Sequence, residues 1–335
     1  MRLDAFVVSV LDGEVARRRL IELNLLHRDV KVQHDENHLY LPLKSVPLDS
    51  SFLPAHRIES IEFEEVSKIV NIKEIIGYAP SFDVIGDIAI LGASSQDPMA
   101  EADAIIKAHK HIRAIFQSTT PLTGEFRTRS LTHLRGNEST KTTYREHGLV
   151  YRLDVAEVYF TPRLGTERER IAGGIRGGVV LDMFAGIGPF SILIGKRHPG
   201  VKVIAVDKNK SAVHYLSENI RENNAENVYP VFADSIMLPV RSGSADYVIM
   251  NLPHDAEKFL SEVFRVIRAD GIIYYYDITP EDDLYQGSIE TIQTAGSSMR
   301  CVVEVLSERV VRSYSPHHYN TCIESQVHKI GLTQV

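Results

Sequence analysis

The sequence predicts an α/β protein whose C-terminal part is a mostly parallel sheet ending in an antiparallel hairpin, preceded by two small α+β domains. At 335 residues the chain exceeds the usual range for one hydrophobic core. From Val179 onward, strand-like and helix-like segments alternate as in successive βα units. Residues 302–311 and 319–330 are rich in β-forming residues with only RSYSPHH between them, which predicts the hairpin.

The domain boundaries are expected where this pattern changes. Residues 1–66 form a small α/β domain, in which AFVVSV predicts a strand, EVARRRLIELNLL a helix, and VKVQ with HLYLPL a hairpin. Residues 67–80 are expected to be a linker. Residues 81–172 form a middle α+β domain, and residues 173–335 form the parallel-sheet domain.

In the middle domain, FDVIGDIAIL predicts a strand, followed by a helix from about Pro98 to Phe116. Short strands are expected after it, through Arg127, Tyr144, Tyr151 and Tyr159. In the last domain the expected strands are VVLDMF, KVIAVD, VYPVFAD, DYVIMN and GIIYYYDI, with helices from PFSILIGKR, SAVHYLSENIREN and AEKFLSEVFRVIR. This alternation predicts helices on both faces of the sheet.

Composition and charge exclude several classes of protein. The chain is 44% hydrophobic and 24% charged, which is typical of globular proteins, and its net charge of −7 argues against binding nucleic acid through bulk charge. Its two cysteines, Cys301 and Cys322, show no metal-ligand spacing, so neither a disulfide nor a metal site is expected. The absence of a signal peptide or a long apolar run favours a cytoplasmic location and no membrane partner.

The segment VVLDMFAGIGPF, from Val179 to Phe190, predicts a ligand crevice. A buried strand leads into Gly186 and Gly188, and Pro189 opens a helix where a missing N–H is harmless. Small residues allow the backbone to approach a bound nucleoside at the strand ends. An ordinary strand-to-helix turn containing two glycines is the alternative.

The following strand ends favour a nucleoside site of Rossmann-like type. KVIAVD delivers Asp207 about twenty residues later, where a carboxylate can accept both ribose hydroxyls. A dinucleotide fingerprint requires a third glycine, and that position holds Ser191 in this sequence. A nucleoside without phosphate therefore fits better than a dinucleotide. Asp234 is placed to accept from an adenine amino group, and the next strand ends in Asn251-Leu252-Pro253-His254.

These motifs resemble known families. FAGIGPF with Asp207, Asp234 and NLPH resembles the class I S-adenosylmethionine-dependent methyltransferases, and NLPH resembles the N-P-P-Y signature of nitrogen methylation. GEFRTRSLTHLRG, VAEVYFTPRLGTERERI and RVVRSYSPHHY resemble the archaeal and eukaryotic tRNA (guanine-37-N1)-methyltransferase family. The resemblance covers nearly the whole chain and is weakest in the first 65 residues. It implies a tRNA-docking domain, a middle domain and a catalytic domain.

The resemblance also implies roles for individual residues. Guanine N1 carries a proton, so a general base is needed, and Glu167 in GTERER is the implied base. Arg127 would stabilise the charge that develops on O6, and Asn251 would position the target guanine. The implied contacts with S-adenosylmethionine come from Arg168, Phe184, Gly186, Asp207, Lys208, Asp234, Ser235 and Asn251.

Structural explanations stand beside these roles. Glu167 could serve a helix dipole in its first turn, Arg127 could be a surface or phosphate-binding arginine, and Arg168 could pair with a glutamate. His254 occupies the aromatic position of N-P-P-Y, so stacking on a flipped-out guanine is expected from another side chain. The candidates are Tyr159, Phe160, Tyr314, Pro316 and Tyr319.

The expected partner is tRNA. Residues 127–176 hold ten basic residues against six acidic ones, an excess of four in an acidic chain, and predict the path of the anticodon stem-loop. Arg17, Arg18 and Arg19 could grip a distant part of the tRNA or form a solvated helix face. A monomer is expected.

Two alternatives remain open from sequence. A wyosine-pathway enzyme of the same fold would transfer an aminocarboxypropyl group from the same donor, or act as a dual methyltransferase. An NAD-dependent oxidoreductase, or a catalytically silent RNA-binding protein, would keep the crevice for another purpose.

Overall fold

The computed structural model describes residues 1–47, 54–65, 71–119 and 128–330. It divides into two compact units, Met1–Ile75 and Ile76–Val335. Arg127 lies outside the described residues, so its predicted strand and its predicted role have no structural counterpart here.

The first unit is a four-stranded antiparallel sheet with one helix. Its strands run in the order β2 (Gln33–His34), β3 (His38–Pro42), β1 (Arg2–Ser9) and β4 (His56–Glu62). Helix α1 (Gly13–Glu22) buries Ala16 and Leu20 against Phe6, Val8 and Leu41 of the sheet. The opposite face of α1 carries the exposed arginine triplet Arg17 to Arg19.

The first unit ends within α2 (Ile72–Ile76), and the second unit begins with a four-stranded sheet. Its strands are β5 (Phe82–Ile85), β6 (Ile88–Leu91), β7 (Ala114–Ser118) and β8 (Leu131–Gly136), with α3 (Pro98–Ala108) between β6 and β7. A separate hairpin follows, formed by β9 (Lys141–Glu146) and β10 (Leu149–Asp154).

The helix expected from Pro98 to Phe116 is shorter than predicted. It ends at Ala108, since His109 leaves helical geometry with φ −118 and ψ 86. Phe116 lies instead in β7, parallel to β6. A short buried apolar run such as AIF fits the periodicity of a buried helix and of a buried strand alike. Tyr159, expected in a strand, lies in the loop after β10.

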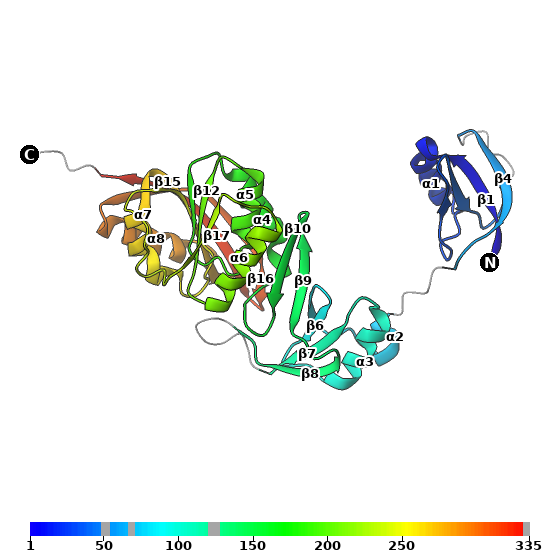
Figure 1. The fold of residues 1–335 in the computed structure, drawn as a ribbon, viewed down its shortest axis with the longest axis horizontal. Coiled ribbons are helices and arrows are strands. Elements are labelled where there is room, and N and C mark those ends of the chain that lie inside the picture. The colour runs from blue at the N-terminus through cyan, green and yellow to red at the C-terminus, as the bar shows by residue number, and fades with distance from the viewer. Residues whose placement is uncertain (48–53, 66–70, 120–127, 331–335) are drawn as a thin grey trace, which may run out of the picture. The chain divides into compact units, whose positions relative to one another are not determined.

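A seven-stranded sheet dominates the second unit (Figure 1). Its order is β13 (Val228–Phe232), β12 (Lys202–Asp207), β11 (Val179–Asp182), β14 (Ala245–Met250), β15 (Ile267–Pro280), β17 (His318–Lys329) and β16 (Cys301–Ser315). The first five strands are parallel, and β17 and β16 add an antiparallel hairpin. The predicted fold class is confirmed.

Helices cover both faces of this sheet. On one face, α4 (Gly165–Gly174), α5 (Pro189–Arg197) and α6 (Lys210–Glu222) pack in a core that continues into the β9–β10 hairpin. On the other face lie α7 (Leu260–Val266) and α8 (Gln286–Ser298). Helix α8 is not predicted from the sequence, because its Gly, Ser and Thr residues lower the helix propensity of the segment.

The central strands β11 and β14 are buried on both faces because successive residues enter different cores. Val180 and Ile249 belong to the core beneath α4 to α6, whereas Leu181 and Val248 belong to the core beneath α7 and α8. Among the described residues, no helix is long and apolar enough to cross a membrane.

Candidate active site at the carboxyl ends of the parallel strands

A cavity of about 580 Å³ opens at the carboxyl ends of β11, β12 and β14 and beside the loop after β13. This is where the strand order reverses, because the chain leaves β11 toward β12 and β13 on one side and later returns through β14 and β15 on the other. Ligands of open α/β sheets bind at this switch point. Of the residues expected to bind cofactor, the cavity is lined by Phe184, Gly186, Asp207, Lys208, Asp234, Ser235 and Asn251.

The two glycines of the first loop have different tasks. Gly186 lines the cavity with φ +56, and a Cβ there would meet only the Tyr159 carbonyl oxygen, at 3.8 Å. Gly188 has φ +93, and a Cβ there would lie 2.5 Å from Leu216 Cδ1 of α6. The missing side chain of Gly186 therefore leaves space in the cavity, whereas that of Gly188 permits close packing against α6.

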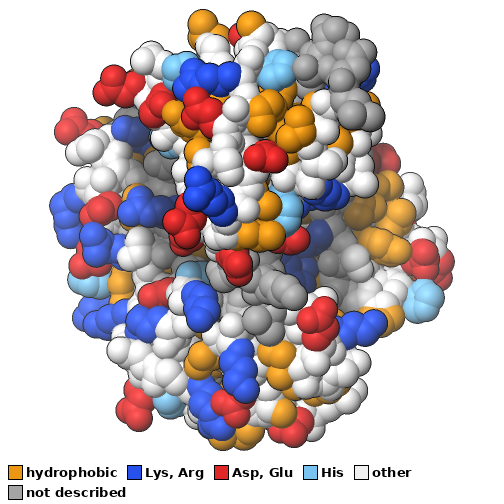
Figure 2. Space-filling view, turned by 90° about the vertical axis from the view of Figure 1, so that its right-hand side faces the viewer, with side chains coloured by type: hydrophobic (Ala, Val, Ile, Leu, Met, Phe, Trp, Pro, Cys, Tyr) orange, Lys and Arg blue, Asp and Glu red, His pale blue; other side chains and the backbone are white. Residues whose placement is uncertain are grey.

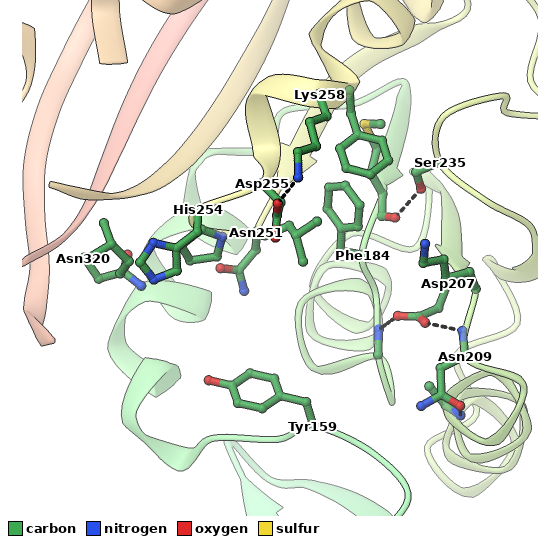
Figure 3. Close-up of a pocket in the computed structure, with 18 of the residues that line it drawn as sticks. Tyr159, Phe184, Asp207, Asn209, Ser235, Asn251, His254, Asp255, Lys258 and Asn320 are labelled. Carbon is green, nitrogen blue, oxygen red and sulfur yellow. Dashed lines mark hydrogen bonds and ion pairs between the residues drawn. The ribbon is translucent and has the colours of Figure 1, made fainter. Parts of the chain in front are cut away.

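Asp207 organises the loop from below. Its Oδ2 accepts a 2.7 Å hydrogen bond from Gly186 N, and its Oδ1 accepts a 2.8 Å bond from Asn209 N (Figure 3). Burial raises the pKa of this carboxyl, while the backbone donors act in the opposite direction. The carboxylate lies at the cavity wall and keeps lone pairs for a ligand hydroxyl.

The far wall is formed by the loop after β13. Asp234 pairs with Lys208 at 3.5 Å, and Ser235 donates a 2.6 Å hydrogen bond to the Met183 carbonyl oxygen. Phe184 packs edge-on against Phe259, with ring centroids 4.9 Å apart. One apolar wall and nearby acceptors suit a planar base with an exocyclic amine.

The NLPH turn forms the other side of the cavity, from Asn251 to His254. His254 has the unusual φ of +78, which places a non-glycine residue in the left-handed region. Its ring packs edge-on against Tyr314, with centroids 5.5 Å apart. Strained backbone at a cavity is typical of a functional turn.

Glu167 lies outside the cavity lining. It occupies the first turn of α4 with only 3% of its surface exposed. Arg170 grips the carboxylate through Nε and Nη2, at 3.0 and 2.7 Å, and the Tyr276 hydroxyl donates a 2.8 Å hydrogen bond to Oε1. Arg309 Nε lies 3.8 Å from Oε2.

Strand register relates Glu167 to the cavity. Tyr276, Cys322 and Arg309 form a row across β15, β17 and β16, and the carboxylate of Glu167 contacts two of them. The row formed by Ile278, Asn320 and Arg312 lines the cavity. On β15 and β17 the two rows are two residues apart on the same face, roughly 7 Å along the strands. Glu167 therefore lies one row beneath the cavity floor.

Arg168 also lies away from the cavity lining. Its guanidinium is 2% exposed, pairs with Glu146 of β9 at 2.8 Å, and donates a 2.7 Å hydrogen bond to the Thr161 carbonyl oxygen. It lies over the rings of Phe160 and Phe190. The glutamate pairing considered from the sequence is present, and contact with a cofactor stays a prediction.

Only some of the residues proposed to stack on the target guanine line the cavity. Tyr159 and Tyr314 line the cavity, as does His254. Phe160 is buried in the core, with its ring 5.0 Å from that of Tyr144. Pro316 and Tyr319 are not among the lining residues.

Sequence reasoning missed several residues that line the cavity, chiefly Asn209, Lys258, Arg312 and Asn320. Asn209 caps α6 by accepting from Ser211 N and Ala212 N, which its position before a helix could have indicated. Arg312 and Asn320 reach the cavity only through the pairing of β16 and β17. The sequence predicts this hairpin, but no local signal fixes the register that brings these two residues to the cavity.

The basic stretch is largely paired with acids from other segments. Arg129 and Arg163 bind Asp83, Arg135 binds Asp103, and Arg152 binds Glu222. The excess of positive charge counted along the sequence is therefore offset in space. Figure 2 shows basic and acidic side chains interspersed on the visible face. No cluster able to hold a metal ion occurs among the described residues.

Comparison with known proteins decides the family. Residues 142–306 match the TRM5/TYW2 methyltransferase domain, and residues 8–51 match the tRNA methyltransferase 5 N-terminal domain. The chain is 40% identical over 338 residues to the tRNA (guanine(37)-N(1))-methyltransferase Trm5b of Pyrococcus abyssi, covering 96% of this chain and 98% of the relative. The chain belongs to the tRNA (guanine-37-N1)-methyltransferase family. The resemblance recognised from the sequence is confirmed.

Solved structures of the family have a fold similar to that of this chain. A complex of aTrm5 with tRNALeu matches with a TM-score of 0.70 and 33% identity, over 96% of this chain and 99% of that one. Trm5 of Methanocaldococcus jannaschii in complex with adenosine matches with a TM-score of 0.63 and 34% identity, over 98% of this chain and 100% of that one. A tRNA(Phe) aminocarboxypropyltransferase of the same organism is 34% identical over 251 residues, covering 74% of this chain and 98% of that relative. Membership of this family removes the support for an NAD-dependent oxidoreductase.

Proposed function

We propose that this Trm5-family protein transfers a methyl group from S-adenosylmethionine to N1 of guanosine 37 in tRNA. One observation carries the proposal: the cavity at the switch point brings together Asp207, Asp234 and Asn251, the three strand-end residues that the family resemblance assigns to donor and acceptor.

The residues of the cavity fit a nucleoside sulfonium. Asp207 offers carboxylate oxygens for ribose hydroxyls, and Asp234 offers an acceptor for the adenine amino group, with Phe184 as an apolar wall. Gly186 leaves the space that a Cβ would occupy. When bound, S-adenosylmethionine supplies an electrophilic methyl group, so the protein must orient the acceptor and remove its proton. Contact with Arg168 is proposed on the family resemblance alone.

Glu167 is the proposed general base for the N1 proton. Its carboxylate is buried among Arg170, Tyr276 and Arg309, one strand row beneath the cavity floor. Donors on both oxygens fix the orientation of the carboxylate and limit its rotation. Arg170 also binds Glu324 at 3.1 Å, so its charge is shared between two carboxylates. Asn251 at the cavity would position the target guanine, and Arg127 would stabilise the charge that develops on its O6.

The other units of the chain have proposed tasks in docking. Residues 1–66 are the proposed tRNA-docking domain, supported by the exposed Arg17 to Arg19 on α1, although Arg18 pairs with Glu14 at 3.8 Å and Arg19 with Glu22 at 2.7 Å. Residues 67–80 are the proposed linker, 81–172 the middle domain with RNA contacts and 173–335 the methyltransferase domain. A monomeric state and a cytoplasmic location stay predictions.

The mechanism is tested by single-turnover methylation of a tRNA transcript. Glu167→Gln keeps the shape and removes the base, so a loss of at least 100-fold in rate is expected. Glu169→Gln, two residues later and half-buried, is the matched control and should change the rate less than threefold. An unchanged rate in Glu167→Gln would exclude this residue as the base.

A second function is favoured by the 34% identity with the aminocarboxypropyltransferase. That reaction would use the same donor but transfer a different group to a wyosine precursor. Mass spectrometry of nucleosides from reacted tRNA separates the two, because methyl and aminocarboxypropyl groups differ in mass. We expect the methyl product alone from a tRNA with unmodified guanosine 37.

A further inference from the structure

The cavity has a second side, formed by the antiparallel hairpin. Ile278 of β15, Asn320 of β17 and Arg312 of β16 are register partners across three strands, and all three line the cavity. In Figure 3, Asn320 lies on the side of His254, away from Asp207. Of the expected cofactor residues, Asp207 and Ser235 lie on the opposite side, which leaves this wall for the acceptor nucleotide.

Two polar atoms in this wall lack partners among the described residues. Asn320 is 3% exposed, and its buried Oδ1 accepts no hydrogen bond. Arg312 Nε is buried and donates none, although Nη1 donates a 3.2 Å bond to the Ser313 carbonyl oxygen. Buried polar groups are paired in the great majority of cases, so two adjacent exceptions at a cavity indicate a ligand.

One atom is an acceptor and the other a donor, on directly paired strand positions. Side chains of such pairs lie within contact distance of each other. The terminal torsion of asparagine is broad, so a small rotation presents Oδ1 to the cavity. The guanidinium of Arg312 lies 5.8 Å over the Tyr314 ring, which restricts its direction.

We propose that Arg312 and Asn320 bind the ribose 2′-hydroxyl of the target nucleotide. A hydroxyl accepts from Arg312 and donates to Asn320 at the same time, which satisfies both atoms with one group. The 2′-hydroxyl is also the group by which proteins distinguish RNA from DNA. This inference rests on the proposed function.

Other ligand groups fit less well. A phosphate diester only accepts, so it would satisfy Arg312 Nε and leave the oxygen of Asn320 without a donor. The Watson–Crick edge of guanine carries O6 and N1, which the proposed reaction already directs to Asn251, Arg127 and Glu167. The 2-amino group could donate to Asn320, and the test below separates that case.

The test compares full-length protein acting on two tRNAs that differ in one atom, with guanosine or 2′-deoxyguanosine at position 37. Wild type should lose about tenfold in kcat/KM on the deoxy substrate, equivalent to roughly 1.4 kcal/mol. In Asn320→Leu, the ratio between the two tRNAs should fall to about one. Asn320→Asp keeps an acceptor oxygen and should keep the discrimination.

Two controls separate a loss of hydroxyl recognition in Asn320→Leu from a loss of folding. Ser325→Ala changes a buried serine on β17 that does not line the cavity and whose Oγ has no partner among the described residues, and it should behave as wild type. Calorimetric affinity for S-adenosylmethionine should be the same for all variants. Equal rates of wild type on both tRNAs, or an unchanged ratio in Asn320→Leu, would overturn the proposal.

A third tRNA with inosine 37 lacks the 2-amino group. If Asn320→Leu abolishes discrimination against inosine rather than against the deoxynucleotide, the pair reads the base edge and the ribose assignment is wrong. If wild type does not methylate the all-ribose guanosine tRNA at all, the proposed function fails, and this inference with it.

Discussion

The hydroxyl of Tyr276 donates a 2.8 Å hydrogen bond to Oε1 of Glu167, joining the end of β15 to the first turn of α4. Tyr276 is completely buried, and burial raises the pKa of its phenol well above the usual value, so it stays a donor. The proposed base is therefore oriented by the same sheet that lines the acceptor side of the cavity.

Removing this hydroxyl should slow methyl transfer without loosening substrate binding. A hydrogen bond to a charged group contributes about 1.5–3 kcal/mol. Tyr276→Phe is expected to lower the single-turnover rate about tenfold, with little change in tRNA affinity. Tyr275→Phe removes a hydroxyl from the opposite face of the same strand, beneath α7 and α8, and should leave the rate unchanged. Equal effects of the two substitutions would contradict the positioning role.

The buried pair between Arg168 and Glu146 should be structural as well as functional. Both side chains are nearly inaccessible, at 2% and 8% exposure. Glu146→Gln leaves the guanidinium charge buried without a counter-ion, which should lower the free energy of unfolding by about 3–5 kcal/mol. Thermal unfolding measures this. Arg135→Gln, which breaks the more exposed pair with Asp103, serves as the comparison and should have a much smaller effect.

Asp182, at the end of β11, predicts a dependence of stability on pH. Its carboxyl is fully buried, accepts a 2.6 Å hydrogen bond from Ser191, and burial raises its pKa to about 7. Between about pH 4 and pH 7 the folded state holds a proton that the unfolded state releases, so stability falls as pH rises through that window.

Asp182→Asn removes this dependence and can still accept from Ser191. The variant should be more stable than wild type at pH 8, by up to roughly 4 kcal/mol, and the advantage should vanish below about pH 4. Denaturant unfolding across this range tests the prediction. A constant difference at all pH values would show that folding does not shift the pKa of this carboxyl.

Alanine substitutions of the two loop glycines should have different effects on stability and on cofactor binding. Gly188→Ala combines a φ of +93 with a 2.5 Å approach to Leu216, so it should destabilise the fold by several kcal/mol. Gly186→Ala meets no close neighbour, so its effect on stability should be limited to roughly 1 kcal/mol of backbone strain. Its added methyl group enters the cavity, so weaker binding of S-adenosylmethionine is expected by calorimetry. The reverse order of stabilities would contradict this division.

The sequence predicts strand-end chemistry well because such residues follow directly from local pattern. Asp207, Asp234 and Asn251 each come at or just after a parallel strand, and the carboxyl ends of parallel strands meet at one edge. The apolar run around Phe116 shows the limit of this approach, because its periodicity fits a buried helix and a buried strand equally well.

The hairpin side of the cavity could not be predicted in the same way. Arg312 and Asn320 reach the cavity through a register between β16 and β17 that contains bulges, including one between Val310 and Arg312. A shift of one residue would turn these side chains to the other face. The burial of Glu167 likewise depends on contacts with Tyr276, more than a hundred residues away in the chain.

The most direct test of the central claim is transfer of labelled methyl from S-adenosylmethionine to a tRNA transcript, followed by nucleoside mass spectrometry. One methyl group per tRNA is expected, recovered as 1-methylguanosine, and none when guanosine 37 is replaced by adenosine. Label at another position, another base or the same level in the altered tRNA would contradict it.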